Sequence, residues 1–264
     1  MKSNDKIVIH DPWEGLKEFT DARIGLGRCG TSLPLSEVLD FKLAHAKARD
    51  AVLQPMQIEK MIEELAGDGI ASVALSSSVE SRNEYLTRPD RGRCLSDNSK
   101  KILADKALEV DVCLVVGDGL SSRAIHENGM PFIHSFFSVI TKSSFLVSPV
   151  CFVDNCRVAI ADEIAPFFKA KLSIILIGER PGLSSPNSLG IYLTYGPTPG
   201  TTDESRNCIS NIRTGGLSIA EGVQKLSYLI ENAFIQKESG VYLKDKMGDD
   251  YLPFGVKSYA PIGY

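Results

Sequence analysis

The sequence lacks a long apolar run, a surplus of positive charge and any paired-cysteine motif. Its most apolar stretch, 131–153, is interrupted by Lys142 and several serines before about 20 apolar residues accumulate, so no segment resembles a transmembrane helix. The 29 Lys and Arg are outnumbered by 33 Asp and Glu, which give a net charge of -4. The chain therefore lacks the basic character of a nucleic-acid-binding protein. We expect neither a membrane nor a nucleic acid as its partner.

The six cysteines include no C-x-x-C pair, which argues against a structural zinc site. Cys113 and Cys151 lie inside apolar runs typical of buried strands, so we expect reduced thiols. The first dozen residues contain acidic side chains and no apolar segment typical of a secretion signal. These features favour a cytoplasmic protein.

The 264 residues, 43% of them hydrophobic and 23% charged, are enough to form a well-filled core. We predict an α/β fold, with a smaller, mainly helical N-terminal region over 1–110 and a Rossmann-like, mostly parallel sheet over 111–240. The tail, 241–264, has neither helical nor strand periodicity. For this tail we favour a loosely held terminus over a segment that covers a partner.

Short apolar runs that end in polar, glycine-rich segments predict the strands. The expected strands are 71–75, 112–116, 150–153, 173–177 and 191–195, and the expected helices lie near 34–53, 56–66, 97–108, 121–128, 132–141, 162–171 and 218–234. This alternation is typical of parallel strands whose loops, including 178–182 and 196–200, meet at one edge of the sheet. Ligands of open α/β sheets bind at that edge.

Residues 25–30 form a G-x-G-x-x-G motif, but no buried strand precedes it and 31–34 delay the following helix. A turn before a helix is therefore favoured over a dinucleotide site. In that helix Val38, Phe41, His45, Ala48 and Val52 form a stripe at helical spacing. A hydrogen-bonded histidine in the core or at an interface is the favoured interpretation of His45.

Several polar residues at the expected strand ends suggest other chemistry. Residues 117–121 superficially resemble a nucleophile elbow, but G-x-S-x-G is absent and nothing fixes His126 or His134 as a base. Asp118, Asp154 and Glu179 could meet at a metal site, although each could equally cap a helix or accept a ligand hydrogen bond, and we predict no metal.

The segment 85–93, YLTRPDRGR, places three arginines near one turn. They could clamp a carboxylate or phosphate, or form a salt-bridge cluster, and both interpretations stay open.

Four segments together resemble the small (light) subunit of ethanolamine ammonia-lyase. They are LTRPDRGR at 86–93, DGLSS at 118–122, GERPGLSSPNSLG at 178–190 and CISNI at 208–212, in the order and spacing of that family. The resemblance extends over about 23–240, which is most of the chain.

The resemblance implies a carbon-nitrogen lyase that is active only in a hetero-oligomer. A large subunit with a TIM barrel would carry the ethanolamine site, and adenosylcobalamin, with its own base on cobalt, would lie between the two chains. Homolysis of the cobalt-carbon bond would start a radical rearrangement of ethanolamine to acetaldehyde and ammonia. This chain would supply no catalytic residue, only cofactor contacts.

By position in the family's motifs, those contacts fall on Val158, Glu179 and Cys208. The carboxylate of Glu179 can accept a hydrogen bond from an amide arm or a ribose hydroxyl, and Val158 offers an apolar surface. We expect Cys208 to contribute its backbone or small size, without ligating cobalt.

Two departures accompany the resemblance. The D-x-H-x-x-G motif of some cobalamin proteins is absent, which agrees with a base-on cofactor, and the N-terminus is short, which leaves packaging in a bacterial microcompartment open. The alternative function is a stand-alone Rossmann-like nucleotide-binding or regulatory module. That alternative predicts tight nucleotide binding by the isolated chain.

Overall fold

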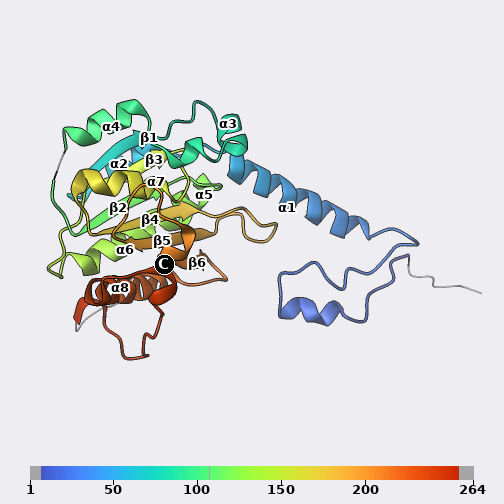
Figure 1. Ribbon diagram of the computed structural model, residues 1–264. Helices are drawn as coiled ribbons and strands as arrows, with labels where there is room; N and C mark the ends of the chain where they lie inside the picture. Colours follow the sequence, from blue (N-terminus) through green and yellow to red (C-terminus); the bar gives the residue numbers. More distant parts are fainter. Residues whose placement is uncertain (1–6, 107, 256–264) are drawn as a thin grey trace, which may run out of the picture.

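A six-stranded sheet, in the order β1-β3-β2-β4-β5-β6, lies at the centre of the protein (Figure 1). The computed structural model describes residues 7–106 and 108–255. The strands are β1 (Ser72–Ser76), β2 (Val112–Gly117), β3 (Val150–Asp154), β4 (Leu172–Gly178), β5 (Leu189–Tyr195) and β6 (Arg206–Ile212). Strands β1 to β4 are parallel to one another, whereas β5 is antiparallel to both β4 and β6. The predicted mostly parallel α/β sheet is confirmed, and the Rossmann-like label stays a prediction.

Helices surround the sheet close to the expected positions. They are α1 (Leu35–Leu53), α2 (Ile58–Gly67), α3 (Arg82–Thr87), α4 (Asp97–Ala104), α5 (Ser122–Ala124), α6 (Met130–Ile140), α7 (Ile160–Ile164) and α8 (Ile219–Gln236), and the π-helical segment η3 (Ile125–Gly129) joins α5 to α6. Serine side chains cap the N-termini of several of these helices by accepting a hydrogen bond from a backbone amide of the first turn. Ser218, for example, forms a capping box with Glu221 at the start of α8. Among the helices of the described residues, none is long and apolar enough to cross a membrane.

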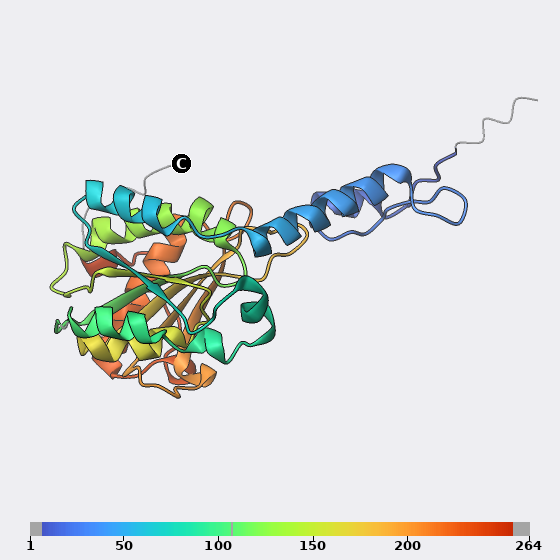
Figure 2. The same cartoon turned by 90° about the horizontal axis from the view of Figure 1, so that it is seen from above.

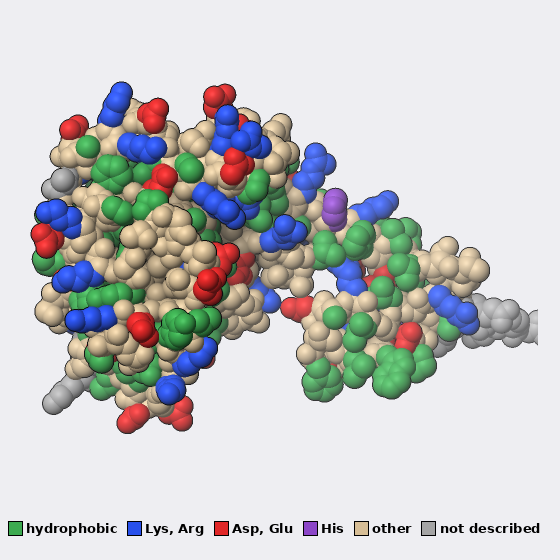
Figure 3. All heavy atoms as spheres, in the orientation of Figure 1, with side chains coloured by type: hydrophobic (Ala, Val, Ile, Leu, Met, Phe, Trp, Pro, Cys, Tyr) green, Lys and Arg blue, Asp and Glu red, His purple; other side chains and the backbone are tan. Residues whose placement is uncertain are grey.

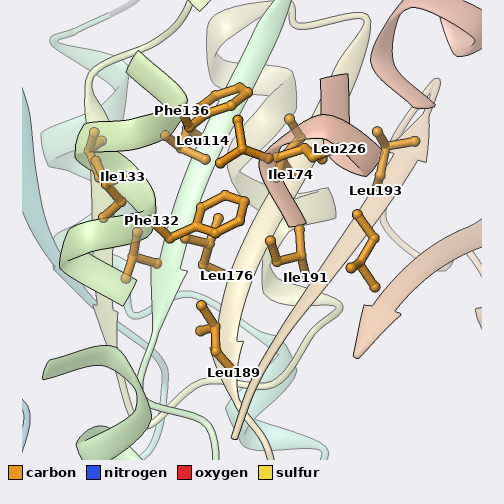
Figure 4. Close-up of a cluster of buried hydrophobic side chains, with 14 of the residues drawn as sticks. Leu114, Phe132, Ile133, Phe136, Ile174, Leu176, Leu189, Ile191, Leu193 and Leu226 are labelled. Atoms are coloured by element: carbon orange, nitrogen blue, oxygen red, sulfur yellow. The ribbon is translucent and has the colours of Figure 1, made fainter. Parts of the chain in front are cut away.

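The first face of the sheet is covered by α2, α6 and α8, and the second by α4 and α7 (Figure 2). Alternate residues of β2, β4 and β5, such as Leu114, Ile174 and Ile191, pack against Phe132 and Phe136 of α6 on the first face (Figure 4). This alternation follows from the two-residue period of a strand. The first face is thereby covered from β3 to β6.

The second face is covered only over part of the sheet. Its core contains residues of β1 to β4, including Cys113 and Cys151, and Tyr192 of β5 packs at its margin. Within the described residues β6 contributes nothing to this core, so Tyr192 and the neighbouring Cys208 lie beyond the helices. All six cysteines are free, as predicted.

Strand β5 differs from the prediction in direction. The connection 179–188 between β4 and β5 contains no helix to return the chain for a parallel pairing, and the two strands form an antiparallel hairpin. The prediction that 196–200 joins the other loops was therefore wrong. Tyr195 pairs with Leu172, so this segment follows β5 at the opposite edge. Strand β6, which contains the CISNI motif, was not predicted as a strand.

The two ends of the chain behave differently. Helix α1 projects away from the sheet, and residues 7–34 lie at its outer end (Figures 1 and 2). The described part of the tail packs on the chain itself: Leu243 is buried, and the hydroxyl of Tyr251 donates to Glu231 of α8 at 2.5 Å. The expected loosely held terminus is wrong for 241–255, and 256–264 lie outside the described residues. The division near residue 110 stays a prediction, although β1 precedes it and belongs to the sheet.

A buried ion pair connects β6 to α7, and it gives the first testable prediction. The guanidinium of Arg206 donates to Asp162 at 2.7 and 3.0 Å, with both side chains almost fully buried, and at 3.3 Å to Asp203, which is 95% exposed. Removing the buried carboxylate leaves an uncompensated charge. We expect Asp162→Ala to lower the free energy of unfolding by about 3–5 kcal/mol.

Asp203→Ala is the matched control, because it removes an exposed partner of the same arginine. Its expected cost is at most about 1 kcal/mol. Urea denaturation of the two variants measures both values, and equal costs would contradict this account of the pair.

Candidate functional site

The loops after β2, β3 and β4 converge at the carboxyl edge of the sheet, as predicted for parallel strands. The amide of Leu120 donates to the carbonyl of Gly178 at 2.9 Å, which brings the β2 and β4 loops into contact. A Cβ atom on Gly178 would lie 2.1 Å from the carbonyl oxygen of Ser121, so only glycine fits this approach. The backbone itself therefore forms the floor of the candidate site.

A hollow of 410 Å³ opens between these loops. Tyr85, Leu120, Val158, Glu179 and Tyr192 are among the residues that line it. A second hollow, of 670 Å³, is lined by residues that include Arg93, Thr201 and Arg206. Arg157 and Val158 line both hollows, so the two adjoin each other.

Val158 and Glu179, two of the three predicted cofactor contacts, line the same hollow. The half-buried carboxylate of Glu179 accepts hydrogen bonds from the hydroxyls of Ser188 and Ser210, each at 2.5 Å, and from the amide of Asn211 at 3.3 Å. These bonds connect the β4–β5 loop to the end of β6. Because a carboxylate offers about four acceptor sites, one remains for a ligand.

Cys208, the third predicted contact, lies beside the hollow. It is exposed on β6, directly opposite Tyr192 of β5, and the two side chains are hydrogen-bonded. Desolvation raises the pKa of the Cys208 thiol, the hydrogen bond with Tyr192 lowers it, and nearby Glu179 raises it further. Burial raises the pKa of the Tyr192 hydroxyl too. At neutral pH this part of the site therefore carries no charge.

Tyr85 supports the hollow from α3. Its ring is buried, its hydroxyl donates to the carbonyl of Cys156 at 2.9 Å, and the guanidinium groups of Arg157 and Arg82 lie 4.1 and 4.6 Å from the ring centre. The Nε atom of Arg157 is buried without a hydrogen-bond acceptor in the described part of the protein. The hydrogen-bonding capacity of this atom, beside the hollow, is therefore unused within that part of the chain.

The roles of Tyr85, Arg157 and Tyr192 were missed in the sequence. Tyr85 begins the YLTRPDRGR segment, and Arg157 directly precedes Val158, so proximity to motif residues was a usable signal for both. No such signal marked Tyr192. Its place in the site depends on the antiparallel pairing of β4 and β5, which the periodicity of the sequence does not predict.

Arg82 connects three parts of the chain at this edge. It donates to the side chain of Asp118 at 2.7 Å, to the carbonyl of Gly119 at 2.9 Å and to the carbonyl of Val52 in α1 at 2.8 Å. Asp118 is buried and also accepts from the amide of Cys156 at 3.1 Å. Burial raises the pKa of the Asp118 carboxyl to about 7, against the opposing attraction of Arg82.

The three carboxylates considered for a metal have separate partners. Asp118 accepts from Arg82, Glu179 from two serines, and Asp154 from the side-chain amide of Asn155 at 2.8 Å. In 7–106 and 108–255, no group of three His, Cys, Asp or Glu side chains is arranged to hold a metal ion.

The residues that suggested a nucleophile elbow have other partners. The hydroxyl of Ser121 donates to the carbonyl of Pro186 at 2.7 Å, and the ring of His126 contacts Gln54 and the amide of Gln57 at 3.2 and 3.1 Å. His134 lies between the carboxylates of Glu64 and Asp68. The serine and both histidines therefore bind neighbouring parts of the chain, and they are not arranged as a nucleophile and its base.

The three arginines of 85–93 were expected either to form salt bridges or to clamp a carboxylate or phosphate, and the structure divides them between these two roles. Arg88 pairs with Asp90 and Arg91 with Glu84, whereas Arg93 lines the larger hollow. Two of them thus form salt bridges, and the third faces a space that a ligand can enter.

The glycine motif at 25–30 lies beyond the outer end of α1. Cys29 and Ser32 bridge across a turn at Gly30 and Thr31, which confirms a turn before the helix. His45 of α1 is exposed and stacks on Phe41, so it is not a core residue of this chain.

Comparisons with known proteins agree with the resemblance seen in the sequence. The sequence model of the family described as ethanolamine ammonia-lyase light chain (EutC) matches residues 10–244. The ethanolamine ammonia-lyase small subunit of Pseudomonas fluorescens (strain SBW25) is 48% identical over 240 residues, 89% of this chain and 87% of the relative. The small subunit of the same enzyme from Ralstonia nicotianae is 43% identical over 256 residues, 96% of this chain and 95% of the relative.

The buried carboxyl of Asp118 gives a prediction about pH. Its pKa rises from 3.8 to about 7 on folding, so between these pH values the folded chain holds a proton that the unfolded chain releases. The free energy of unfolding should therefore fall as pH rises from 5 to 7, by up to about 1.4 kcal/mol per pH unit from this group.

Asp118→Asn should lose this contribution, whereas Asp249→Asn, at an exposed position, should keep it. Urea denaturation at several pH values compares the three proteins. The same pH dependence in all three would contradict the assignment to Asp118.

Proposed function

Because the chain belongs to the ethanolamine ammonia-lyase light-chain family, we propose that it is the small subunit of an adenosylcobalamin-dependent lyase that converts ethanolamine to acetaldehyde and ammonia. The name small subunit implies a large-subunit partner. In this proposal the large subunit is a TIM barrel that carries the ethanolamine site, and the lyase is active only as a complex. This chain binds the lower side of the cobalamin.

One observation carries the proposal: two of the three residues expected to contact the cofactor line one hollow, and the third is the strand partner of a residue that lines it. Val158 reaches it from the loop after β3, and Glu179 from the loop after β4. Cys208 lies beside the hollow, because it pairs on β6 with Tyr192, which lines the hollow. Residues from three separate segments of the sequence thus meet on one part of the surface.

The chemistry of the hollow suits a corrin, which has an apolar rim and amide arms. Val158, Leu120 and Ile177 supply apolar surface. The Nε of Arg157 is an unused buried donor, and Glu179 keeps an acceptor site. The adjoining hollow at Arg93 and Arg206 extends the space toward a region where a nucleotide tail can lie.

When bound, adenosylcobalamin would supply the organic radical that starts the rearrangement. The residues of this chain bind and orient one side of the cofactor. Since the raised pKa keeps Cys208 a neutral thiol, it does not compete as a thiolate for cobalt, which agrees with a base-on cofactor. A cytoplasmic location, free or inside a bacterial microcompartment, is part of the proposal.

Coexpression with a large subunit tests the function. The purified pair should form acetaldehyde from ethanolamine only when adenosylcobalamin is present, and neither chain alone should do so. An inactive pair at saturating cofactor would contradict the proposal.

Substitution of Glu179 tests the site itself. Glu179→Ala removes the acceptor and the bonds that hold Ser188 and Ser210, so we expect cobalamin to dissociate from the complex more readily. The loss should match one charge-assisted hydrogen bond, about 1.5–3 kcal/mol. The measurement is a spectroscopic titration of the complex with cobalamin.

Glu238→Ala is the control, because Glu238 is an exposed acid after α8 and lines neither hollow. Its complex should bind cobalamin like the unsubstituted one. If Glu179→Ala also leaves the dissociation constant unchanged, Glu179 does not belong to the site.

A further inference from the structure

The projecting part of the chain, residues 7–53, which we call the arm, exposes an unusual amount of apolar surface. Of the 20 large hydrophobic side chains exposed in the described residues, 12 lie in the arm. They include Trp13 (67% exposed), Phe19 (84%) and Leu35 (72%). Figure 3 shows hydrophobic atoms spread over the visible face of the arm. Exposed apolar surface of this extent indicates an interaction site.

The exposed residues of α1 do not share a single side of the helix. Leu35, Leu39 and Leu43 follow one another at four-residue spacing and form one stripe, with Leu39 and Leu43 each 55% exposed. Phe41 is exposed at another angle, beneath the guanidinium of Arg23. Only Ala51 of this 19-residue helix is buried. Exposed apolar side chains thus lie on two sides of α1, with charged residues such as Asp40 and Lys42 between them, and contact with a partner on one side would cover only part of them.

The arm holds a definite shape of its own. Lys17 pairs with Glu37 of α1 at 2.9 Å, and Ile9 bridges to Arg28 within the outer segment. At the inner end of α1, the carbonyl of Val52 accepts from Arg82, which also binds Asp118 beside the hollow. The arm therefore starts from the edge of the sheet that carries the candidate site.

We propose that the arm is the principal docking element for the large subunit and inserts into a groove of that chain. This inference rests on the proposed function. Two identical arms packed together would cover one side of each α1 and leave the other side exposed, whereas a groove in a larger chain covers both. Because the arm starts beside the hollow, a partner bound to it also stands over the cofactor surface.

The test compares substitutions in the arm and in the body of the chain, within the complete complex. The double variant Leu39→Asp, Leu43→Asp introduces charges into the stripe, and Ile235→Asp does so at a body position that is 76% exposed. We expect the dissociation constant for the large subunit to rise about a hundredfold or more in the arm variant. It should stay unchanged in the control.

A second variant, Trp13→Ala with Phe19→Ala, leaves α1 intact and should also weaken the pair, even if the first variant folds poorly. Unchanged affinity in the second variant would overturn the inference. So would an isolated chain that self-associates through the arm while its affinity for the large subunit is insensitive to these changes. An active wild-type pair with unaffected arm variants contradicts the inference alone, and an inactive wild-type pair contradicts the proposed function.

Discussion

Strands β5 and β6 extend beyond most of the helical cover of the second face, although Arg206 at the start of β6 pairs with Asp162 of α7, and the candidate site depends on this mismatch. Helices α4 and α7 bury the second face over β1 to β4. The antiparallel hairpin then adds β5 and β6 without a helix between β4 and β5. Tyr192 and Cys208 therefore face a surface that, in the described part of the protein, no helix covers. A sheet of parallel strands alone would need another crossover helix, which would occupy the neighbourhood of that surface.

A network of charged and aromatic groups fixes the edge of this surface. Tyr85 lies between the guanidinium groups of Arg82 and Arg157, and its hydroxyl holds the loop after β3. Arg82 contacts the loop after β2 and the end of α1 through separate hydrogen bonds. The hollow and the arm thus share one anchor. Because Arg82 contacts both parts, a chain bound to the arm would have a defined position relative to the surface proposed to bind the cofactor.

The sequence was sufficient for the strands β1 to β4 and for most helices, because buried strands and amphipathic helices have distinct periodicities. Motifs that resemble a family indicated Val158 and Glu179, which line one hollow in the structure, and their contact with a cofactor stays a prediction. The sequence was not sufficient for the direction of β5, which depends on the path of 179–188 and on pairing between distant residues. Tyr192 was missed for that reason, and Arg82 because its partners, Val52 and Asp118, are far from it in the sequence.

The central claim is that one hollow on the uncovered part of the sheet receives the cobalamin. The most direct measurement is a structure of this chain with its large subunit and bound cobalamin. The account predicts that the lower side of the corrin contacts Val158 and Glu179, with Cys208 next to it across Tyr192. A cofactor bound on another face, with Val158 and Glu179 remote from it, would contradict the account.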